Sequence, residues 1–219
     1  MDDEEASPRP KVAKPPATRK GRKSAEAFRV AAADVFAQRG FLNATVLDIA
    51  TAAGRSPAAF YYHFDSKEHI LLELFKDFTQ TIKDRAQERF DPASSPQVQI
   101  DQMVRNFYQT YIEWLPVLTG VFQLSMIDAD FREHWRTIRV DAVRSIRHWV
   151  IDAQRRGFAA DLDVDFAASA LAAMLDGFCF IWLAHDGDLP AVRLDSERAQ
   201  RTLSLLCYIS LYGAIDDDR

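Results

Sequence analysis

The feature that most constrains this chain is a series of closely spaced helix starts and stops between residues 24 and 68. Ser24 is a good N-cap, and apolar residues then recur at i, i+4, i+7 and i+8, as on one buried helical face: Phe28, Ala32, Val35 and Phe36. Arg39-Gly40 predicts the end of this helix, because Gly readily takes the left-handed conformation that follows a helix.

A second, much shorter helix is predicted to begin at Thr45. The spacing Thr45-x-x-Asp48 resembles a capping box, in which two residues satisfy each other's unpaired backbone N–H groups. The inner face of this helix repeats at i, i+3, i+4 and i+7: Val46, Ile49, Ala50 and Ala53. Gly54 ends the helix after little more than two turns.

A third short helix follows the turn at Arg55. Ser56 is suited to the N-cap and Pro57 to the first helical position, where the missing N–H of proline is no loss. We expect this helix to run to about His63, with Phe60 facing the core.

The rest of the chain is predicted to be helical to its end. Residues 65–68 start a long fourth helix that extends towards Phe90, with an apolar stripe: Leu71, Leu74, Phe75, Phe78 and Ile82. Further helices are expected at residues 97–114, 116–126, 128–156, 164–185 and 196–213. No run of alternating apolar and polar residues is flanked by hairpin turns, so the fold class is all-α, with about nine helices.

Two short helices joined by a tight glycine-containing turn, with a further helix packed across them, form the helix-turn-helix arrangement. The first short helix crosses the phosphate backbone of DNA, and the second presents side chains to base edges in the major groove. Thr45 at a helix start offers a hydroxyl and backbone N–H groups to a phosphate, and Arg55 and Ser56 are placed to reach bases. We expect further contacts with the groove wall and the backbone: Tyr61, Tyr62, His63 and Lys67.

Each of these residues also has a purely structural interpretation. Thr45 is an N-cap with or without DNA, and His63 can cap the end of its helix. One of Tyr61 and Tyr62 can pack on the fourth helix, although adjacent helical residues point about 100° apart, so that at least one should be exposed. Lys67 alone can be a solvated charge. The ordered combination favours the DNA-binding interpretation.

The order of these motifs resembles the tetracycline-repressor (TetR) family. The resemblance covers about residues 25–75 and rests on four runs: Phe36-Ala-Gln-Arg-Gly-Phe41, Ala44-Thr-Val-Leu-Asp-Ile-Ala50, Ala53-Gly54, and Ser56-Pro-Ala-Ala-Phe-Tyr-Tyr-His-Phe64 followed by Ser66-Lys-Glu68. It implies an all-helical homodimer that binds a palindromic operator. It also implies that a small molecule in the C-terminal domain releases the protein from DNA.

The resemblance also implies roles for single residues. Thr45 matches the phosphate-binding helix start of the family, and five residues match positions that face the groove: Arg55, Ser56, Pro57, Ala58 and Tyr61. Three residues match common backbone contacts: Tyr62, His63 and Lys67. Leu47 departs from the family, in which many relatives have a polar or basic residue there; this side chain can touch a thymine methyl group or pack against the N-terminal arm.

Residues 1–23 are rich in Pro, Ala, Lys and Arg without helical periodicity and are predicted to be a disordered basic arm. Arg22 and Lys23 either contact DNA, for example in the minor groove, or belong to a solvated tail. The formal charge is −1 over residues 1–18, +3 over 19–69 and −7 over 70–219, which suits a phosphate-facing module with a separate regulatory body. The predicted domains are the arm, a DNA-binding domain at 24–68 and a ligand-binding and dimerisation domain at 69–219.

All four tryptophans and many phenylalanines lie in the C-terminal domain. Aromatic stripes at helical spacing form either core or the wall of an apolar ligand pocket. We predict a pocket for a hydrophobic effector with this lining: Phe107, Tyr111, Trp114, Phe122, Met126, Trp135, Met174, Phe178 and Trp182.

Six arginines in the helix at 128–156 recur at spacings near 3, 4 and 7: Arg132, Arg136, Arg139, Arg144, Arg147 and Arg155. They either meet an anionic group of the effector, such as a carboxylate or the phosphate of an acyl-CoA-like molecule, or form a solvated face balanced by Glu133, Asp141 and Asp152.

The last two helices are predicted to form a homodimer interface. Their faces are too apolar for solvent: Phe166, Ala170, Leu171, Met174 and Phe178 on one, and Leu203, Leu206, Cys207, Ser210 and Leu211 on the other. The alanines between residues 167 and 173 let helices approach closely, and a two-fold dimer suits a palindromic operator.

The remaining features limit the alternatives. No uncharged run exceeds 14 residues, and the N-terminus has no apolar signal core, so we expect a cytoplasmic protein without membrane association. Cys179 and Cys207 are expected to be buried hydrophobes. With no glycine-rich phosphate loop and no metal-ligand spacing, we expect no catalytic residue, metal or cofactor, and no enzyme.

The predicted function is that of a sequence-specific transcriptional regulator, a repressor that a hydrophobic effector releases from its operator. One alternative is a helical small-molecule-binding protein or enzyme without a DNA-binding role. The other is a DNA-binding protein that responds to no ligand.

Overall fold

The computed structural model describes residues 18–86 and 93–213, and every regular element within these ranges is a helix. The chain forms two compact units, each with most of its contacts inside itself: unit 1 ends at Phe78 and unit 2 begins at Thr79. This boundary lies ten residues after the expected one at residue 68. The start of the fourth helix belongs to unit 1, because Leu71 and Leu74 are buried there and Arg29 of the first helix pairs with Asp77.

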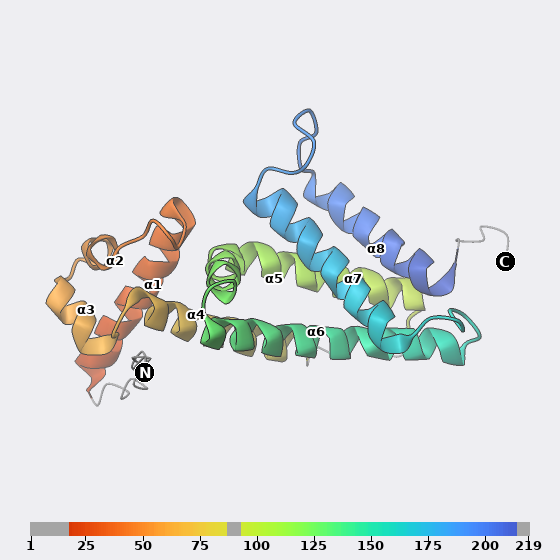
Figure 1. Ribbon diagram of the computed structural model, residues 1–219, viewed down its shortest axis with the longest axis horizontal. Helices are drawn as coiled ribbons and strands as arrows, with labels where there is room; N and C mark the ends of the chain where they lie inside the picture. Colours follow the sequence, from red (N-terminus) through yellow and green to blue (C-terminus); the bar gives the residue numbers. More distant parts are fainter. Residues whose placement is uncertain (1–17, 87–92, 214–219) are drawn as a thin grey trace, which may run out of the picture. The chain divides into compact units, whose positions relative to one another are not determined.

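Unit 1 contains four helical segments (Figure 1): α1 (Arg19–Arg39), α2 (Val46–Ala52), α3 (Pro57–His63) and the first part of α4 (Lys67–Ala86). The helices α1, α2 and α3 all contact one another. Aromatic rings fill their centre: Phe28 meets Phe60 edge-on with 5.4 Å between ring centroids, and Phe36 meets Phe41 at 5.2 Å. The predicted bounds of the two short helices are confirmed.

The first helix begins six residues earlier than predicted. Thr18, rather than Ser24, is its N-cap, and the Thr18 hydroxyl oxygen accepts a hydrogen bond from the N–H of Gly21 at 3.1 Å. Residues 19–23 are therefore helix and not disordered arm. Arg and Lys are good helix formers, but a solvated first turn has no apolar periodicity that would reveal it. The remainder of the predicted arm, residues 1–17, lies outside the described residues.

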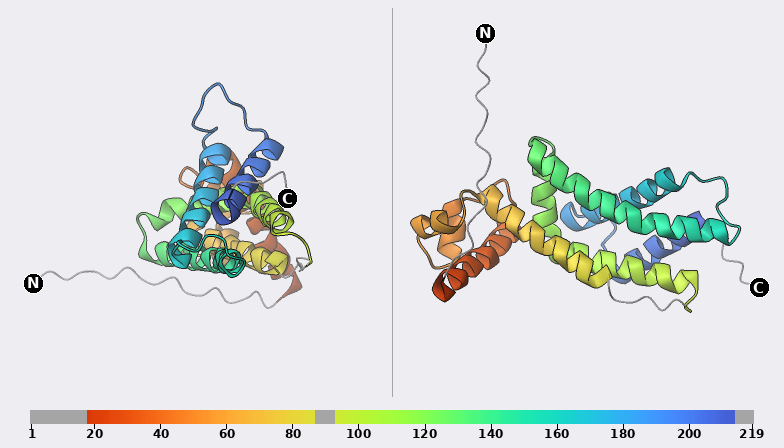
Figure 2. Two further views of the ribbon diagram at one scale, coloured as in Figure 1. Left: turned by 90° about the vertical axis from the view of Figure 1, so that its right-hand side faces the viewer. Right: turned by 90° about the horizontal axis from the view of Figure 1, so that it is seen from below.

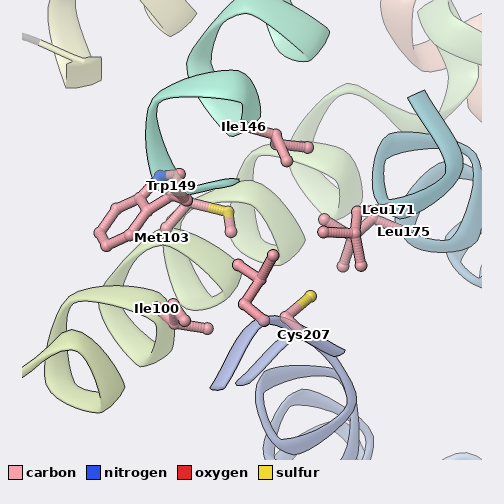
Figure 3. A pocket seen from close by; sticks show the side chains of 8 residues that line it. Ile100, Met103, Ile146, Trp149, Leu171, Leu175 and Cys207 are labelled. Atoms are coloured by element: carbon pink, nitrogen blue, oxygen red, sulfur yellow. The ribbon is translucent and has the colours of Figure 1, made fainter. Parts of the chain in front are cut away.

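Unit 2 contains α5 (Pro96–Ser125), α6 (Ala129–Arg155), α7 (Val164–Cys179), a π-helical turn that continues α7 (Phe180–Ala184), and α8 (Ser196–Tyr212). Helix α5 packs against α6 and α8, α6 packs against α7, and the π-helical turn contacts α5. Figure 2 shows this arrangement from two further directions. The four helices surround a small apolar cavity (Figure 3) of about 10 Å³: Ile100, Met103, Ile146, Trp149, Leu171, Leu175, Cys207 and Leu211 line it.

Two predicted helices, 97–114 and 116–126, are one helix, α5, with Pro116 inside it. Proline in a helix interior costs about 3 kcal/mol, because it removes a hydrogen bond and crowds the preceding turn. The turns after it bury Val117, Leu118 and Val121, and each fully buried side chain of this kind contributes roughly 1.5–3 kcal/mol. Burial on both sides of the proline therefore keeps the helix continuous.

The other predicted bounds need smaller changes. The predictions 128–156 and 196–213 agree with α6 and α8 to within one residue at each end. The predicted helix 164–185 is α-helical only to Cys179 and then becomes a π-helical turn. The described residues thus hold eight α-helices where about nine were predicted, and the stretch of the fourth helix towards Phe90 lies outside them.

Candidate nucleic-acid interface and effector site

The start of α2 is held by Thr45, Asp48 and Arg39. The Thr45 hydroxyl accepts from the backbone N–H of Asp48 at 3.1 Å and donates to the Asp48 carboxylate at 2.6 Å; the Thr45 N–H donates to the same carboxylate at 3.0 Å. Arg39 pairs with the other carboxylate oxygen at 3.0 Å. These groups, first the Thr45 hydroxyl, hold the pKa of Asp48 below its ordinary value of 3.8. The predicted capping box is confirmed.

These hydrogen bonds limit which groups at the start of α2 can bind a phosphate. A hydroxyl has one proton, and Thr45 gives that proton to Asp48, so the hydroxyl is not available to donate to DNA. The N–H groups of Val46 and Leu47 lie in the first helical turn, where backbone donors lack an intrahelical acceptor. The phosphate contact at Thr45 therefore remains a prediction for the backbone of this turn rather than for the hydroxyl. Leu47 is 64% exposed, and its contact with a thymine methyl group stays a prediction.

Helix α3 presents most of the predicted groove-facing residues to solvent. Ser56 caps the helix by accepting a hydrogen bond from the N–H of Ala59 at 3.2 Å, and Pro57 occupies the first position. Phe60 is fully buried on the inner side, whereas Tyr61 is 57% and Tyr62 81% exposed. Both tyrosines, and not only one, are therefore available to DNA. Four further residues of the predicted set are exposed: Arg55, Ser56, Pro57 and Ala58.

His63, the last residue of α3, is half-buried against Phe28, with 6.0 Å between ring centroids. Burial lowers the pKa of His63 below its ordinary value of 6.5, so the neutral imidazole predominates at pH 7 in the free chain. A neutral imidazole can donate a hydrogen bond to a phosphate but brings no positive charge. The predicted backbone contact of His63 thus remains a prediction of a neutral hydrogen bond.

The structure gives Lys67 a role within the protein that the sequence did not predict. Its ammonium group donates to three carbonyl oxygens of the loop between α1 and α2: Phe41 at 3.1 Å, Leu42 at 3.1 Å and Ala44 at 3.0 Å. An ammonium group has three protons, so all of them are used within the protein. Lys67 therefore fastens the loop before α2 to the start of α4 in the free chain, and its predicted contact with a phosphate stays a prediction. No local pattern reveals this, because the acceptors lie 23 to 26 residues away in sequence.

Arg22 and Lys23 are exposed on the first turns of α1. Together with Arg19 and Lys20 they place four cations near the N-terminus of a helix, where the helix dipole disfavours positive charge. A phosphate bound near these four side chains would neutralise their positive charge and so remove this unfavourable interaction with the helix dipole. The contact of Arg22 and Lys23 with DNA remains a prediction.

The buried aromatic centre of unit 1, the solvent-facing side of α3 and the capped start of α2 define a DNA-binding protein of the helix-turn-helix class. The family model for bacterial regulatory proteins of the tetR family matches residues 29–74. The HTH-type transcriptional repressor DhaR of Mycobacterium sp. (strain GP1) is 32% identical over 146 residues, 60% of this chain and 70% of that protein. The chain belongs to the TetR family.

Two further proteins are similar to this chain. The HTH-type transcriptional regulator BetI of Rhizobium meliloti (strain 1021) is 28% identical over 168 residues, 77% of this chain and 79% of that protein. The crystal structure of a transcriptional regulator from Saccharomonospora viridis in complex with choline shares the fold, with a TM-score of 0.69 over 85% of this chain and 95% of that one, at 22% identity. The protein is a DNA-binding transcriptional regulator and not an enzyme.

The predicted effector-pocket residues fall into small groups in unit 2. Three pairs are in ring contact: Phe107 with Tyr111 at 5.7 Å, Phe122 with Trp135 at 5.3 Å, and Phe178 stacked on Trp182 at 5.9 Å. Tyr111 is buried and the other members are half-buried, with one exception. Met126 follows the end of α5 and is 62% exposed, and its place in an effector pocket stays a prediction. None of the predicted residues lines the cavity in Figure 3.

Two features of this region were not predicted from the sequence. The π-helical turn brings the Phe180 ring to 5.0 Å from Phe122 and 4.7 Å from His185. In addition, the Oε1 atom of Gln123 is buried without a hydrogen-bond partner among the described residues. No local signal marks these residues, because their neighbours come from other helices.

An ion pair joins Arg139 of α6 to Asp176 of α7. Burial raises the pKa of Asp176, although the hydrogen bond and the charge of Arg139 oppose this rise. Burial also raises the pKa of Tyr111, and the negative charge of Asp176 adds to the effect. A partly buried ion pair beside a buried tyrosine is thus present within an aromatic region.

The segment Val164–Ala184 is long and apolar enough, by length and composition, to cross a membrane. The expectation drawn from uncharged runs missed it, because Asp165 and Asp176 interrupt the segment. Both aspartates pair with arginines of α6, Arg147 and Arg139, and α7 packs along α6 as a helix of the unit. Only 28% of the most apolar window is buried within the chain.

No group of three or more His, Cys, Asp or Glu side chains in the ranges that the structure describes is placed to hold a metal ion. Cys179 and Cys207 are both buried thiols. Burial raises the pKa of Cys179 to about 12 and that of Cys207 to about 11, so neither forms a thiolate at neutral pH.

Proposed function

We propose that the chain acts in the cytoplasm as a homodimeric repressor, which binds a palindromic operator through α3 and is released by a hydrophobic small molecule bound in unit 2. The observation that carries the proposal is the exposed outer face of α3 above the fully buried Phe60. Arg55 offers charged donors to guanine, while Pro57 and Ala58 offer apolar contact to thymine methyl groups. Because this face has few hydrogen-bonding groups, DNA shape contributes part of the specificity.

An exposed apolar face on α7 and α8 supports the homodimer. Phe166 is 79%, Leu206 46% and Ile209 41% exposed, and a two-fold dimer buries such a face on both copies at once. The set of residues predicted from sequence needs correction. Four of them are buried inside the chain itself and cannot meet a partner: Leu171, Leu203, Cys207 and Leu211. The exposed members remain: Phe166, Ala170, Leu206 and Ser210.

The aromatic region between α5, α6 and the π-helical turn supports the effector site. Phe122 contacts both Trp135 and Phe180, and the buried acceptor of Gln123 lies on the same turn of α5 as Phe122. Apolar walls with a few placed polar groups are typical of small-molecule sites. The cavity in Figure 3 holds about 10 Å³, far below the several hundred Å³ of an ordinary ligand pocket, and none of these aromatic residues lines it, so we do not assign the effector to that cavity.

Selection of bound sequences from random DNA tests the operator half of the proposal. We expect enrichment of an inverted repeat, and light scattering should show a dimer. Failure to enrich any sequence would instead support a helical small-molecule-binding protein without a DNA-binding role.

Denaturation scans against a panel of hydrophobic metabolites test the effector half, because a ligand of the folded state raises the melting temperature. The compound that raises it should release labelled operator from the protein. If no compound raises the melting temperature, or if the bound compound leaves the operator complex intact, the protein is a regulator without this form of ligand control.

A further inference from the structure

A groove of about 400 Å³ runs between α6 and α7, apart from the cavity in Figure 3. Six of its lining residues share one face of α6, and two come from the start of α7: Arg136, Arg139, Val140, Val143, Arg144, Arg147, Asp165 and Ser169. The spacing of the α6 residues at i, i+3, i+4, i+7, i+8 and i+11 places them in one row. Four of the six arginines of this helix therefore converge on a single concave surface.

The lining of this groove is strongly basic on an acidic part of the chain. Four arginines and one aspartate give it a formal charge of +3, whereas residues 70–219 as a whole carry −7. The acidic partners of three of these arginines do not line the groove: Glu133 for Arg136, Asp141 for Arg144 and Asp176 for Arg139. Arg147 differs, because its partner Asp165 itself lines the groove. Three of the four acidic partners thus lie outside the groove, and its lining keeps an excess of positive charge.

Two of these ion pairs, Arg136–Glu133 and Arg144–Asp141, are easily exchanged for ion pairs with a ligand. Arg136 and Glu133 are 3.5 Å apart with both side chains about two-thirds exposed or more, and Arg144 and Asp141 are 3.0 Å apart with both at least half exposed. Exposed pairs of this kind contribute little to stability, so their arginines can turn to a bound anion at small cost. Arg139 differs, because its side chain is 23% exposed and its pair with Asp176 holds the guanidinium in place.

We propose that this groove binds a small organic anion with at least two negative charges, such as a phosphate ester or a polycarboxylate. Arg139 forms the fixed inner contact, Arg136, Arg144 and Arg147 close around the outer charges, and Val140 and Val143 contact the carbon skeleton. The guanidinium group suits this task because its planar fork binds carboxylate and phosphate with two hydrogen bonds. None of the residues that line this groove belongs to the predicted effector pocket, and the proposal does not depend on the proposed release from DNA.

Isothermal titration calorimetry and thermal denaturation of the full chain with citrate and with inorganic pyrophosphate test the proposal. We expect saturable binding of at least one of them, a raised melting temperature and a dissociation constant that rises with salt. Glycerol and sodium chloride at matched ionic strength should not reproduce the shift. Preference between citrate and pyrophosphate distinguishes a carboxylate from a phosphate ligand.

Three variants locate the site. Arg144→Gln with Arg147→Gln changes two solvent-accessible side chains and should weaken binding at least about tenfold, since the anion loses two charged hydrogen bonds. Arg139→Gln with Asp176→Asn removes the inner contact without leaving an unpaired carboxylate and should weaken binding at least as much. Arg155→Gln, on the same helix and outside the groove, should bind as the wild type does. Absence of binding by the wild type, or equal binding by all variants, overturns the proposal.

Discussion

The ammonium group of Lys67 lies 4.7 Å from the centre of the Phe41 ring and donates a hydrogen bond to the Phe41 carbonyl oxygen at 3.1 Å. Phe41 is itself buried against Phe36 of α1. Through this pair the first residue of α4 holds the loop that leads into α2. The charge thus acts within the protein, on the loop that sets where the helix-turn-helix begins.

The substitution Lys67→Ala is expected to lower the free energy of unfolding by about 1–3 kcal/mol, because it removes three charged hydrogen bonds and leaves the loop carbonyls to water. Urea denaturation followed by circular dichroism measures the change.

Lys23→Ala is the matched control, since Lys23 is exposed on α1. It should leave stability unchanged and reduce the salt dependence of operator binding, as loss of a phosphate contact does. If Lys67→Ala keeps wild-type stability and instead lowers the salt dependence, Lys67 is a DNA contact after all.

The helix-turn-helix was predictable because its signals are local. Thr45 with Asp48, and Ser56 with Pro57, lie within a few residues of each other, and both caps form as expected. The buried face of α1 follows from its periodicity in the same way. The role of Lys67 was not predictable, because it depends on how a loop more than 20 residues earlier folds against it.

Unit 2 was less predictable for the same physical reason. Pro116 is a strong local stop signal, but burial of the turns beyond it overrides that signal. Which apolar residues of α7 and α8 face inward or outward depends on packing, so Leu203 is buried while Leu206 is exposed. The pairing of Arg139 with Asp176 joins two helices and leaves no trace in either one alone.

The capping box predicts a pH dependence. The folded-state pKa of Asp48 lies below its ordinary value of 3.8, so the folded state favours the ionised carboxylate. Its contribution to stability is therefore fully present above the ordinary pKa and is lost as the pH falls through the lowered value. Thr45→Val removes the hydroxyl, the largest cause of the shift, and should move the pKa of Asp48 back up towards 3.8 in a carboxyl NMR titration.

Thr51→Val provides the comparison for that titration. Thr51 also carries a hydroxyl on α2, but it donates to the Leu47 carbonyl oxygen at 2.7 Å and not to Asp48. This variant should leave the Asp48 titration unchanged. A Thr45→Val protein with the wild-type Asp48 pKa would show that the Thr45 backbone N–H and Arg39, rather than the Thr45 hydroxyl, hold the carboxylate ionised.

The apolar face of α7 and α8 predicts that Ile209→Glu yields a folded monomer. Ile209 is 41% exposed in the single chain, so a charge there is solvated in the monomer but buried in the proposed dimer. Light scattering at micromolar concentration measures the mass, and circular dichroism checks the fold. Val98→Glu, at a 54% exposed apolar position on α5, should stay dimeric. If light scattering gave the Ile209→Glu and Val98→Glu proteins the same mass, Ile209 would not lie in the dimer interface.

The turn after the π-helical segment predicts a large effect of a single methyl group. Gly187 has a φ of +84°, and a Cβ at this position would overlap the indole ring of Trp182. Trp182 in turn stacks on Phe178, so the indole ring cannot move aside without disturbing this stacked pair. Gly187→Ala should therefore lower the free energy of unfolding by about 1–3 kcal/mol, from backbone strain and overpacking together.

Gly177→Ala is the control for this change, because its Cβ would meet nothing within 4 Å in the chain and its backbone is helical. Alanine there should raise stability by up to about 1 kcal/mol, as expected in a helix interior. Urea denaturation should thus shift the two midpoints in opposite directions with the same slope. A Gly187→Ala protein that unfolds at the wild-type midpoint would mean that Trp182 readily turns aside, and that the loop after α7 is not held by its ring.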